Sequence, residues 1–118
     1  MNYLMLGAIS GSLVVILGAF GAHGLKDILD ESSKSIYNKA VLYQMFHTMG
    51  IFVLGIINKI QPEIQLSLVG WAFLFGIILF SGSLYILAIT GIKSLGMITP
   101  IGGIFFIIGW ILLIVKSV

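Results

Sequence analysis

The segment YLMLGAISGSLVVILGAFGA, residues 3–22, decides the fold because it places twenty residues in a row without a charge. An α-helix rises about 1.5 Å per residue, so about 20 residues cross a hydrocarbon layer that is about 30 Å thick. Three further apolar runs follow, at residues 40–57, 66–90 and 99–115. The pattern predicts four membrane-spanning helices.

Composition also places the chain in a membrane. Of its 118 residues, 59% are hydrophobic and 8% are charged, whereas soluble domains carry about 25% charged residues. A soluble chain of this length has too little interior to hide so much apolar surface from water. The absence of cysteine excludes disulfides and thiolate metal sites. A net charge of +2, scattered along the chain, gives no basis for nucleic-acid binding.

These observations predict a single all-α domain, a polytopic integral membrane protein with four transmembrane helices. The first run has no basic residue before Lys26 and is longer than the apolar part of a secretory signal. We therefore interpret it as a retained helix. Within residues 1–118, the helices are expected at about 3–23, 38–58, 66–90 and 97–116.

A short polar connection follows the first helix and contains a few apolar residues. Leu25, Ile28 and Leu29 fall at positions i, i+3 and i+4, the spacing of one helical face. This pattern predicts a short helical segment that lies in the membrane interface. Ser32 or Ser33 is expected to cap the start of the second spanning helix.

Lysines are distributed unequally between the two ends of the predicted bundle. Alternating helices place four lysines beside the connections at residues 23–39 and 91–99, and two at the end that holds both termini. Cytoplasmic loops carry an excess of lysine and arginine, so we expect these connections in the cytoplasm and both termini outside. Tyr3, Trp71 and Trp110 fall near the end with the termini and suggest an interfacial aromatic belt.

Polar residues within the apolar runs gather toward the end with the two connections. Helix alternation brings the segments GAFGAHGL, YQMFHTMG, FSGSLY and TPIGG to the same leaflet. Polar groups in hydrocarbon usually face the interior of a helix bundle, where they meet partners. The candidate polar or ligand-binding cluster comprises His23, Tyr43, Gln44, His47, Ser81, Ser83, Tyr85 and Thr99.

In these four stretches the chain resembles the uncharacterised YgdD-like family of small bacterial inner-membrane proteins, to which animal transmembrane protein 256 is also related. The resemblance runs from LGAFGAHGL through YQMFHTMG and LFSGSLYILAITG to TPIGGIFFIIGW, which is nearly the whole chain. It implies a four-helix protein of the bacterial inner membrane and supports His23 and His47 as positions of interest. The family has no assigned reaction, so the resemblance implies no activity.

The glycine spacing at residues 18–24 is G-x-x-G-x-x-G, whereas dinucleotide-binding loops need G-x-G-x-x-G between a strand and a helix. A nucleotide site is therefore not expected. Small residues allow membrane helices to pack closely. On this basis we expect the chain to associate with copies of itself through glycine-rich faces. The expected packing residues are Gly7, Gly11, Gly18, Gly21, Gly102 and Gly103.

The two histidines allow several interpretations. Interhelical hydrogen bonding, in which each bond contributes about 0.6–2 kcal/mol, is the simplest. Paired histidines can also ligate haem or a metal, although no third histidine or acid lies near either one in the sequence. A titrating histidine can serve a proton-coupled exporter. Ser81 or Ser83 with His47 can supply the nucleophile and base of a lipid hydrolase or transferase, although no acid is available at that depth.

The favoured function is non-enzymatic: a membrane component that binds lipid or a protein partner through the polar cluster, as a homo-oligomer. The alternative is a small-solute transporter or channel, built as an oligomer, with Tyr43, Gln44 and His47 along the path. We expect no cofactor, no metal and no nucleic acid, and the sequence identifies no small-molecule ligand.

Overall fold

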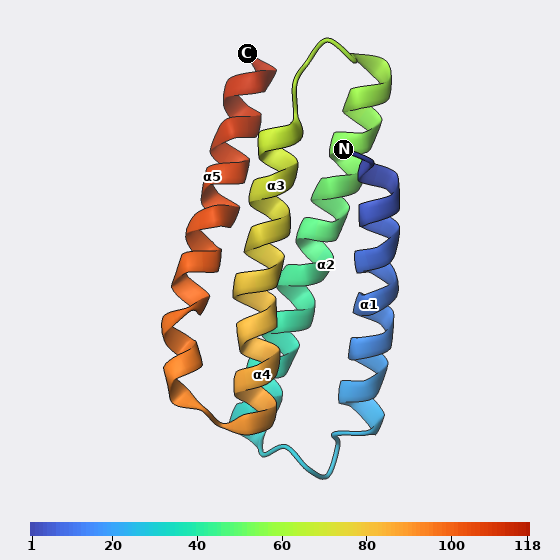
Figure 1. The fold of residues 1–118 in the computed structure, drawn as a ribbon. Coiled ribbons are helices and arrows are strands. Elements are labelled where there is room, and N and C mark those ends of the chain that lie inside the picture. Colours follow the sequence, from blue (N-terminus) through green and yellow to red (C-terminus); the bar gives the residue numbers. More distant parts are fainter.

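The computed structural model describes residues 1–118. The chain runs along the long axis of the molecule four times, each time as a helix, and we call each pass a crossing (Figure 1). Both termini lie at one end, here called the terminal end; the connections at residues 24–30 and 91–98 lie at the other, the loop end (Figure 1). The elements are α1 (Tyr3–His23), α2 (Glu31–Ile60), α3 (Ser67–Gly76), the π-helical turn η1 (Ile77–Ser81), α4 (Gly82–Thr90), the 3-10 turn η2 (Lys93–Met97) and α5 (Thr99–Ser117).

All four crossings are long and apolar enough to span a membrane, and the chain contains no strand. The predicted all-α fold with four transmembrane helices is therefore confirmed. The third crossing is one continuous helix, in which η1 joins α3 to α4. It ends where Gly91 takes a φ of 70°, a left-handed conformation that glycine adopts without strain.

The second helix differs from the prediction at its start. It begins at Glu31 instead of near residue 38, so it is 30 residues long. Asp30 is its N-cap, and one carboxylate oxygen accepts a hydrogen bond from the Ser33 backbone N–H at 2.7 Å. Neither of the two expected serines caps this helix. Polarity places residues 31–39 outside the hydrocarbon, but it does not end a helix that has a good cap.

The connection between α1 and α2 consists of turns instead of the predicted short interfacial helix. Leu25 and Leu29 are buried, whereas Ile28 is 71% exposed, so the three side chains do not share one face. The two leucines pack with Tyr37 and Ala88 in a small apolar cluster. This cluster holds the connection against α2 and α4 at the loop end.

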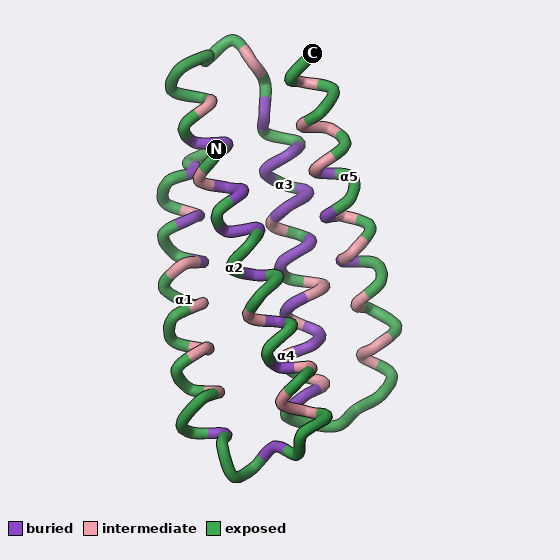
Figure 2. The backbone as a smooth tube through the Cα atoms, turned by 180° about the vertical axis from the view of Figure 1, so that it is seen from behind, coloured by how far each residue is buried: buried purple, intermediate pink, exposed green.

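The four crossings pack as a row and not as a closed bundle. α1 packs on α2, α2 packs on η1 and α4, and both α3 and η1 pack on α5. The molecule is accordingly flat, with extents of 49 × 26 × 18 Å. Figure 2 shows α1 and α5 as mostly exposed outer helices, with buried residues concentrated on the helices between them. The two outer helices therefore present wide apolar faces to lipid.

The main core lies between α2, α3 and α5. Phe73 and Ile51 are fully buried there, and Phe106 joins them from α5. Tyr3 is also buried in this core and so does not belong to the expected aromatic belt, whereas Trp71 is 51% exposed. Since lipid tails are as apolar as these side chains, close packing holds the helices together where escape from water cannot.

The packing glycines expected on α1 all face α2 of the same chain. A Cβ added at Gly7 would lie 2.9 Å from the Phe52 ring, and one added at Gly21 would collide with the Tyr37 ring. These faces are therefore occupied within one chain, and the expected self-association stays a prediction. The facing pairs are Gly7–Phe52, Gly11–Thr48, Gly18–Val41 and Gly21–Tyr37.

Gly102 lets the backbone of α5 approach the backbone of η1. An added Cβ at this position would lie 2.7 Å from the Phe80 Cα and 2.8 Å from the Leu79 carbonyl carbon. At the neighbouring Gly103 the same added atom would meet only the Phe80 ring, at 3.8 Å, which is an ordinary contact. The two adjacent glycines thus have different structural requirements.

Gly102→Ala is expected to destabilise the protein, because backbone atoms cannot move aside as a flexible side chain can. Overpacking of this kind costs about 1–3 kcal/mol. Gly103→Ala is the matched control and should change stability by less than about 0.5 kcal/mol. Thermal unfolding in detergent, followed by circular dichroism, measures both variants. Equal melting temperatures would show that α5 does not pack this closely on η1.

Asp30 gives the start of α2 a defined pH dependence. Its hydrogen bonds from the Ser33 backbone N–H and side chain hold the pKa of the Asp30 carboxyl below its usual value. A carboxylate of this kind adds stability above its unfolded pKa of about 3.9 and loses it as the pH falls through the lower folded pKa. Asp30→Asn keeps a capping side chain without the titration. On acidification the melting temperature of the parent should therefore fall more than that of this variant. If melting temperature plotted against pH runs parallel for the two proteins, the Asp30 cap does not cause the pH dependence of stability.

Candidate functional site

His47 lies midway along α2 and joins it to α5. The His47 Nδ1 is 2.8 Å from the Tyr43 carbonyl oxygen, and the Trp110 indole N–H donates to the His47 Nε2 at 2.9 Å. A carbonyl only accepts and an indole only donates. The imidazole is therefore neutral, with its proton on Nδ1. Phe106 stacks on the ring at a centroid distance of 3.5 Å, and His47 is only 3% exposed.

Both ring nitrogens of His47 are used by this arrangement, so neither offers a free lone pair to a metal or a haem iron. His23 is exposed at the loop end of α1. The Ser10 hydroxyl on α1 contacts Thr48, so His47 lies level with the region of Ser10. Thirteen helical residues, about 20 Å, then separate His23 from that level. The structure does not bring the two histidines together.

Gln44 connects three helices through its amide. The Tyr85 hydroxyl of α4 donates to the Gln44 Oε1 at 2.7 Å. The Gln44 Nε2 donates to the Ser10 hydroxyl of α1 at 3.3 Å and reaches the Ser10 carbonyl oxygen at 3.4 Å. The Ser10 and Thr48 hydroxyls lie 2.6 Å apart. α1, α2 and α4 are thus joined at one depth by a continuous set of hydrogen bonds.

Three further polar side chains of the cluster also have partners within the chain. Ser81 in η1 donates to the Ala40 carbonyl oxygen of α2 at 2.8 Å. The Ser83 and Thr99 hydroxyls lie 2.6 Å apart and link α4 to the start of α5. No buried side-chain nitrogen or oxygen in the protein lacks a hydrogen-bond partner. The buried part of the cluster is therefore internally satisfied, and it offers no unbonded buried polar atom to a ligand.

The structure gathers seven of the eight predicted cluster residues and leaves out His23. His47 and Thr48 lie about midway along α2, and the contact between the Ser10 and Thr48 hydroxyls brings α1 to the same level. Tyr43 is 41% exposed and borders lipid. The seven are Tyr43, Gln44, His47, Ser81, Ser83, Tyr85 and Thr99.

Sequence reasoning missed Trp110 and the part played by Ser10. Trp110 belongs to the interior and not to an interfacial belt, because its indole meets His47. The spacing of Gly102, Phe106 and Gly109, at i, i+4 and i+7, marks the buried face of α5. Trp110 continues that face one turn after Phe106, which is the signal that predicts its inward orientation.

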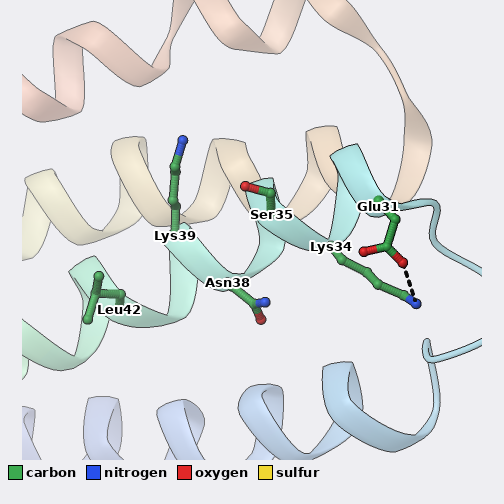
Figure 3. Close-up of a pocket in the computed structure, with 6 residues that line it drawn as sticks. All are labelled: Glu31, Lys34, Ser35, Asn38, Lys39 and Leu42. Atoms are coloured by element: carbon green, nitrogen blue, oxygen red, sulfur yellow. Dashed lines mark hydrogen bonds and ion pairs between the residues drawn. The ribbon is translucent and has the colours of Figure 1, made fainter.

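A second feature lies on the outer face of α2 at the loop end. A cavity of about 440 Å³ opens there, lined by charged and polar side chains and by Leu42 (Figure 3). A further cavity of about 270 Å³ continues it toward mid-membrane along Leu42, Tyr43 and Phe46. We call the two together the α2 groove. The charged part is lined by Glu31, Lys34, Ser35, Asn38, Lys39 and Leu42.

The α2 groove changes in character with depth. Gly21, near the end of α1, packs against Tyr37, which places the first two turns of α2 at or beyond the loop end of the neighbouring helix. Lys34 and Lys39 therefore lie close to headgroup level. Leu42 and Phe46 lie deeper and are 54% and 57% exposed. Helical spacing of three or four residues places these positions on one face, so the groove is charged at its mouth and apolar below.

Comparison with known proteins places the chain in a family. A family model described as a protein of unknown function, DUF423, matches residues 17–103. The chain belongs to the DUF423 family. This confirms the expected family of small, uncharacterised membrane proteins, and the family description assigns no activity.

Relatives of this DUF423 protein are named as membrane proteins. A UPF0382 membrane protein of Staphylococcus epidermidis is 48% identical over 98% of this chain and 93% of its own length. The UPF0382 membrane protein YwdK of Bacillus subtilis is 44% identical over 98% of this chain and 95% of its own length. No solved structure matches the chain. With its four spanning helices, the DUF423 protein is a multi-pass bacterial membrane protein.

The bond between Trp110 and His47 predicts a measurable coupling. Trp110→Phe keeps an aromatic ring but removes the N–H, and His47→Phe removes the acceptor. A double-mutant cycle on thermal or denaturant unfolding in detergent should give an interaction free energy of about 0.6–1.7 kcal/mol. Trp71→Phe, on the lipid-facing surface, is the control and should show no coupling to His47→Phe. Strict additivity of the Trp110 and His47 variants would contradict the bond.

Proposed function

We propose that this protein is a non-enzymatic component of the bacterial cell membrane that binds anionic lipid along the α2 groove. The observation that carries the proposal is the order of side chains in the groove. Lys34 and Lys39 line the mouth of the groove, where a headgroup would meet them, and Leu42 and Phe46 line its deeper part, where acyl chains would follow. A single lipid molecule has the same order of charge and apolar surface along its length.

The mouth of the groove suits a phosphate group. Lysine near an anionic membrane surface gains about 1 kcal/mol, and both lysines can reach toward the headgroup on flexible stems. The Asn38 amide and Ser35 hydroxyl add hydrogen-bond donors. Glu31 opposes this charge in part, because its carboxylate pairs with the Lys34 ammonium at 3.5 Å. An exposed pair of this kind is weak, so an incoming phosphate can compete for the lysine.

The distribution of lysine supports a cytoplasmic position for the loop end. Four lysines lie in or beside the loop-end connections and two lie at the terminal end, and positive charge favours the cytoplasmic side. In this orientation both termini are outside and the groove opens to the inner leaflet of the cell membrane. The anionic lipids of that leaflet are the ones that the lysines would meet.

The interior polar cluster supports a structural role and not a catalytic one. Ser81 donates to a backbone carbonyl oxygen, Ser83 pairs with Thr99, and His47 bonds Tyr43 and Trp110. Neither serine therefore has the histidine as its base. Hydrogen bonds of this kind join membrane helices. On this view the cluster fixes the helices that carry the groove.

The alternative, a small-solute transporter or channel, gains less support. Gln44 and His47 are both 3% exposed and bonded to neighbouring helices. The cavity beside Tyr43 is lined by neither of them. A path along these residues would require the hydrogen bonds that join α1, α2, α4 and α5 to break.

Assembly into a homo-oligomer stays a prediction, and a native mass spectrum reads the number of subunits directly.

Lipid binding is tested by native mass spectrometry of the purified protein with phosphatidylglycerol and phosphatidylcholine added in turn. The parent should retain the anionic lipid preferentially. Lys34→Ala and Lys39→Ala should each weaken phosphatidylglycerol binding about fivefold, since one lysine contributes about 1 kcal/mol. Lys59→Ala and Lys116→Ala, at the terminal end, are the matched controls and should leave it unchanged.

Glu31→Gln should change phosphatidylglycerol binding in the opposite direction from the lysine variants. It removes the carboxylate that opposes the phosphate, so phosphatidylglycerol binding should increase. Equal retention of the two lipids by the parent, or equal losses in the loop-end and terminal-end lysine variants, would contradict a headgroup site at the α2 groove.

A further inference from the structure

A third cavity lies beside the α2 groove, between the end of α1, the connection and the start of α2. It has a volume of about 300 Å³, and Lys26, Lys34 and Asn38 are among the residues that line it. We call it the α1–α2 cleft. Lys34 and Asn38, one turn apart on α2, line both the cleft and the charged mouth of the groove. The two cavities therefore adjoin across these two side chains.

The floor of the cleft is fixed by packing. Tyr37 is 2% exposed, and its hydroxyl donates to the Leu17 carbonyl oxygen of α1. Gly21 leaves room for the Tyr37 ring, which a Cβ there would strike. Leu29 is buried at the adjoining wall. The cleft is thus a shaped hollow between two tied helices, with positive charge at its rim.

The charged mouth of the groove and the α1–α2 cleft are each lined by two lysines, and one lysine lines both. Lys34 and Lys39 line the groove mouth, whereas Lys26 and Lys34 line the cleft. Together with Glu31, the three lysines leave two positive charges around the pair of cavities. Asp27 and Asp30 lie in the neighbouring turn but line neither cavity. A lipid with one phosphate would neutralise only half of this charge.

We propose that the α2 groove and the α1–α2 cleft together bind a lipid with two phosphates, a diphosphatidylglycerol, with one phosphate in each cavity. This inference rests on the proposed lipid-binding function and names the lipid class. Lys34 and Asn38 lie between the two phosphates and contact both, Lys39 meets the first, and Lys26 meets the second. The acyl chains enter the bilayer over the exposed apolar face of α2, which includes Leu42, Phe46 and Met49.

Two phosphates on one molecule bind with an advantage over two separate lipids. Once the first phosphate occupies the groove, the second is held close to the cleft at a high effective concentration. The second phosphate also meets Lys26, and one such lysine increases binding about fivefold. The parent protein should therefore bind diphosphatidylglycerol at least about fivefold more tightly than phosphatidylglycerol.

The experiment compares tetraoleoyl diphosphatidylglycerol with dioleoyl phosphatidylglycerol in a native mass spectrometry titration of the full-length protein in detergent. Lys26→Ala should lower the affinity for diphosphatidylglycerol to that for phosphatidylglycerol, and it should leave phosphatidylglycerol binding in the groove unchanged. Lys39→Ala should weaken both lipids. Lys93→Ala, at the same end but outside both cavities, is the matched control and should change neither. Melting temperatures confirm that each variant is folded.

The outcomes separate this inference from the function on which it rests. Equal affinity of the parent for the two lipids, or a diphosphatidylglycerol preference that survives Lys26→Ala in a folded protein, would overturn the two-phosphate site and leave single-phosphate binding standing. If neither anionic lipid binds more tightly than phosphatidylcholine, both the two-phosphate site and the proposed lipid-binding function are overturned. The result that we expect is one diphosphatidylglycerol per chain in the parent, bound by Lys26→Ala no more tightly than phosphatidylglycerol.

Discussion

Water is absent from the hydrocarbon core of a bilayer, so each buried polar side chain must find its hydrogen-bond partner within the protein. That constraint organises this molecule. Gln44 meets Tyr85 and Ser10, His47 meets Trp110, and Ser81 meets a carbonyl oxygen of the neighbouring helix. Each of these contacts joins two helices that no hydrophobic driving force would bring together in lipid. Glycines then allow the backbones to come close enough for the bonds to form.

The same constraint separates structure from candidate function. The interior cluster has the residue types of a catalytic or conducting site, yet its buried polar atoms all have hydrogen-bond partners within the protein. The surface at the loop end is different, because lysine, asparagine and serine line open cavities beside an apolar face. Recognition of lipid therefore fits the outside of the helix row, and the interior provides the rigidity that keeps the cavities in shape.

Much of the fold follows from the sequence, because runs of apolar residues long enough to cross a bilayer have few other stable conformations. The start of α2 did not follow, since residues 31–39 are polar and only the Asp30 cap determines where the helix begins. Which residues join the cluster was largely predictable, because a buried polar group in hydrocarbon is costly. Their hydrogen-bond partners were not predictable, since Trp110 and His47 are 63 residues apart in the sequence. The separation of His23 from His47 was not predictable either, because it depends on how far each helix extends along its neighbour.

The π turn in the third crossing has a consequence for register. An α-helix turns about 100° per residue, so four-residue steps drift around its surface, and a wider turn compensates by admitting one more residue. η1 thereby keeps Ser81 and Tyr85 on the side of the crossing that Phe73 and Ile77 present to α2 and α5. Deleting a single residue between 77 and 81 would therefore restore a regular α-helical turn with the residues after it nearly in phase, whereas a deletion elsewhere in the crossing would rotate everything after it by about 100°. The length of η1 can thus change by one residue where the length of the regular helix on either side cannot.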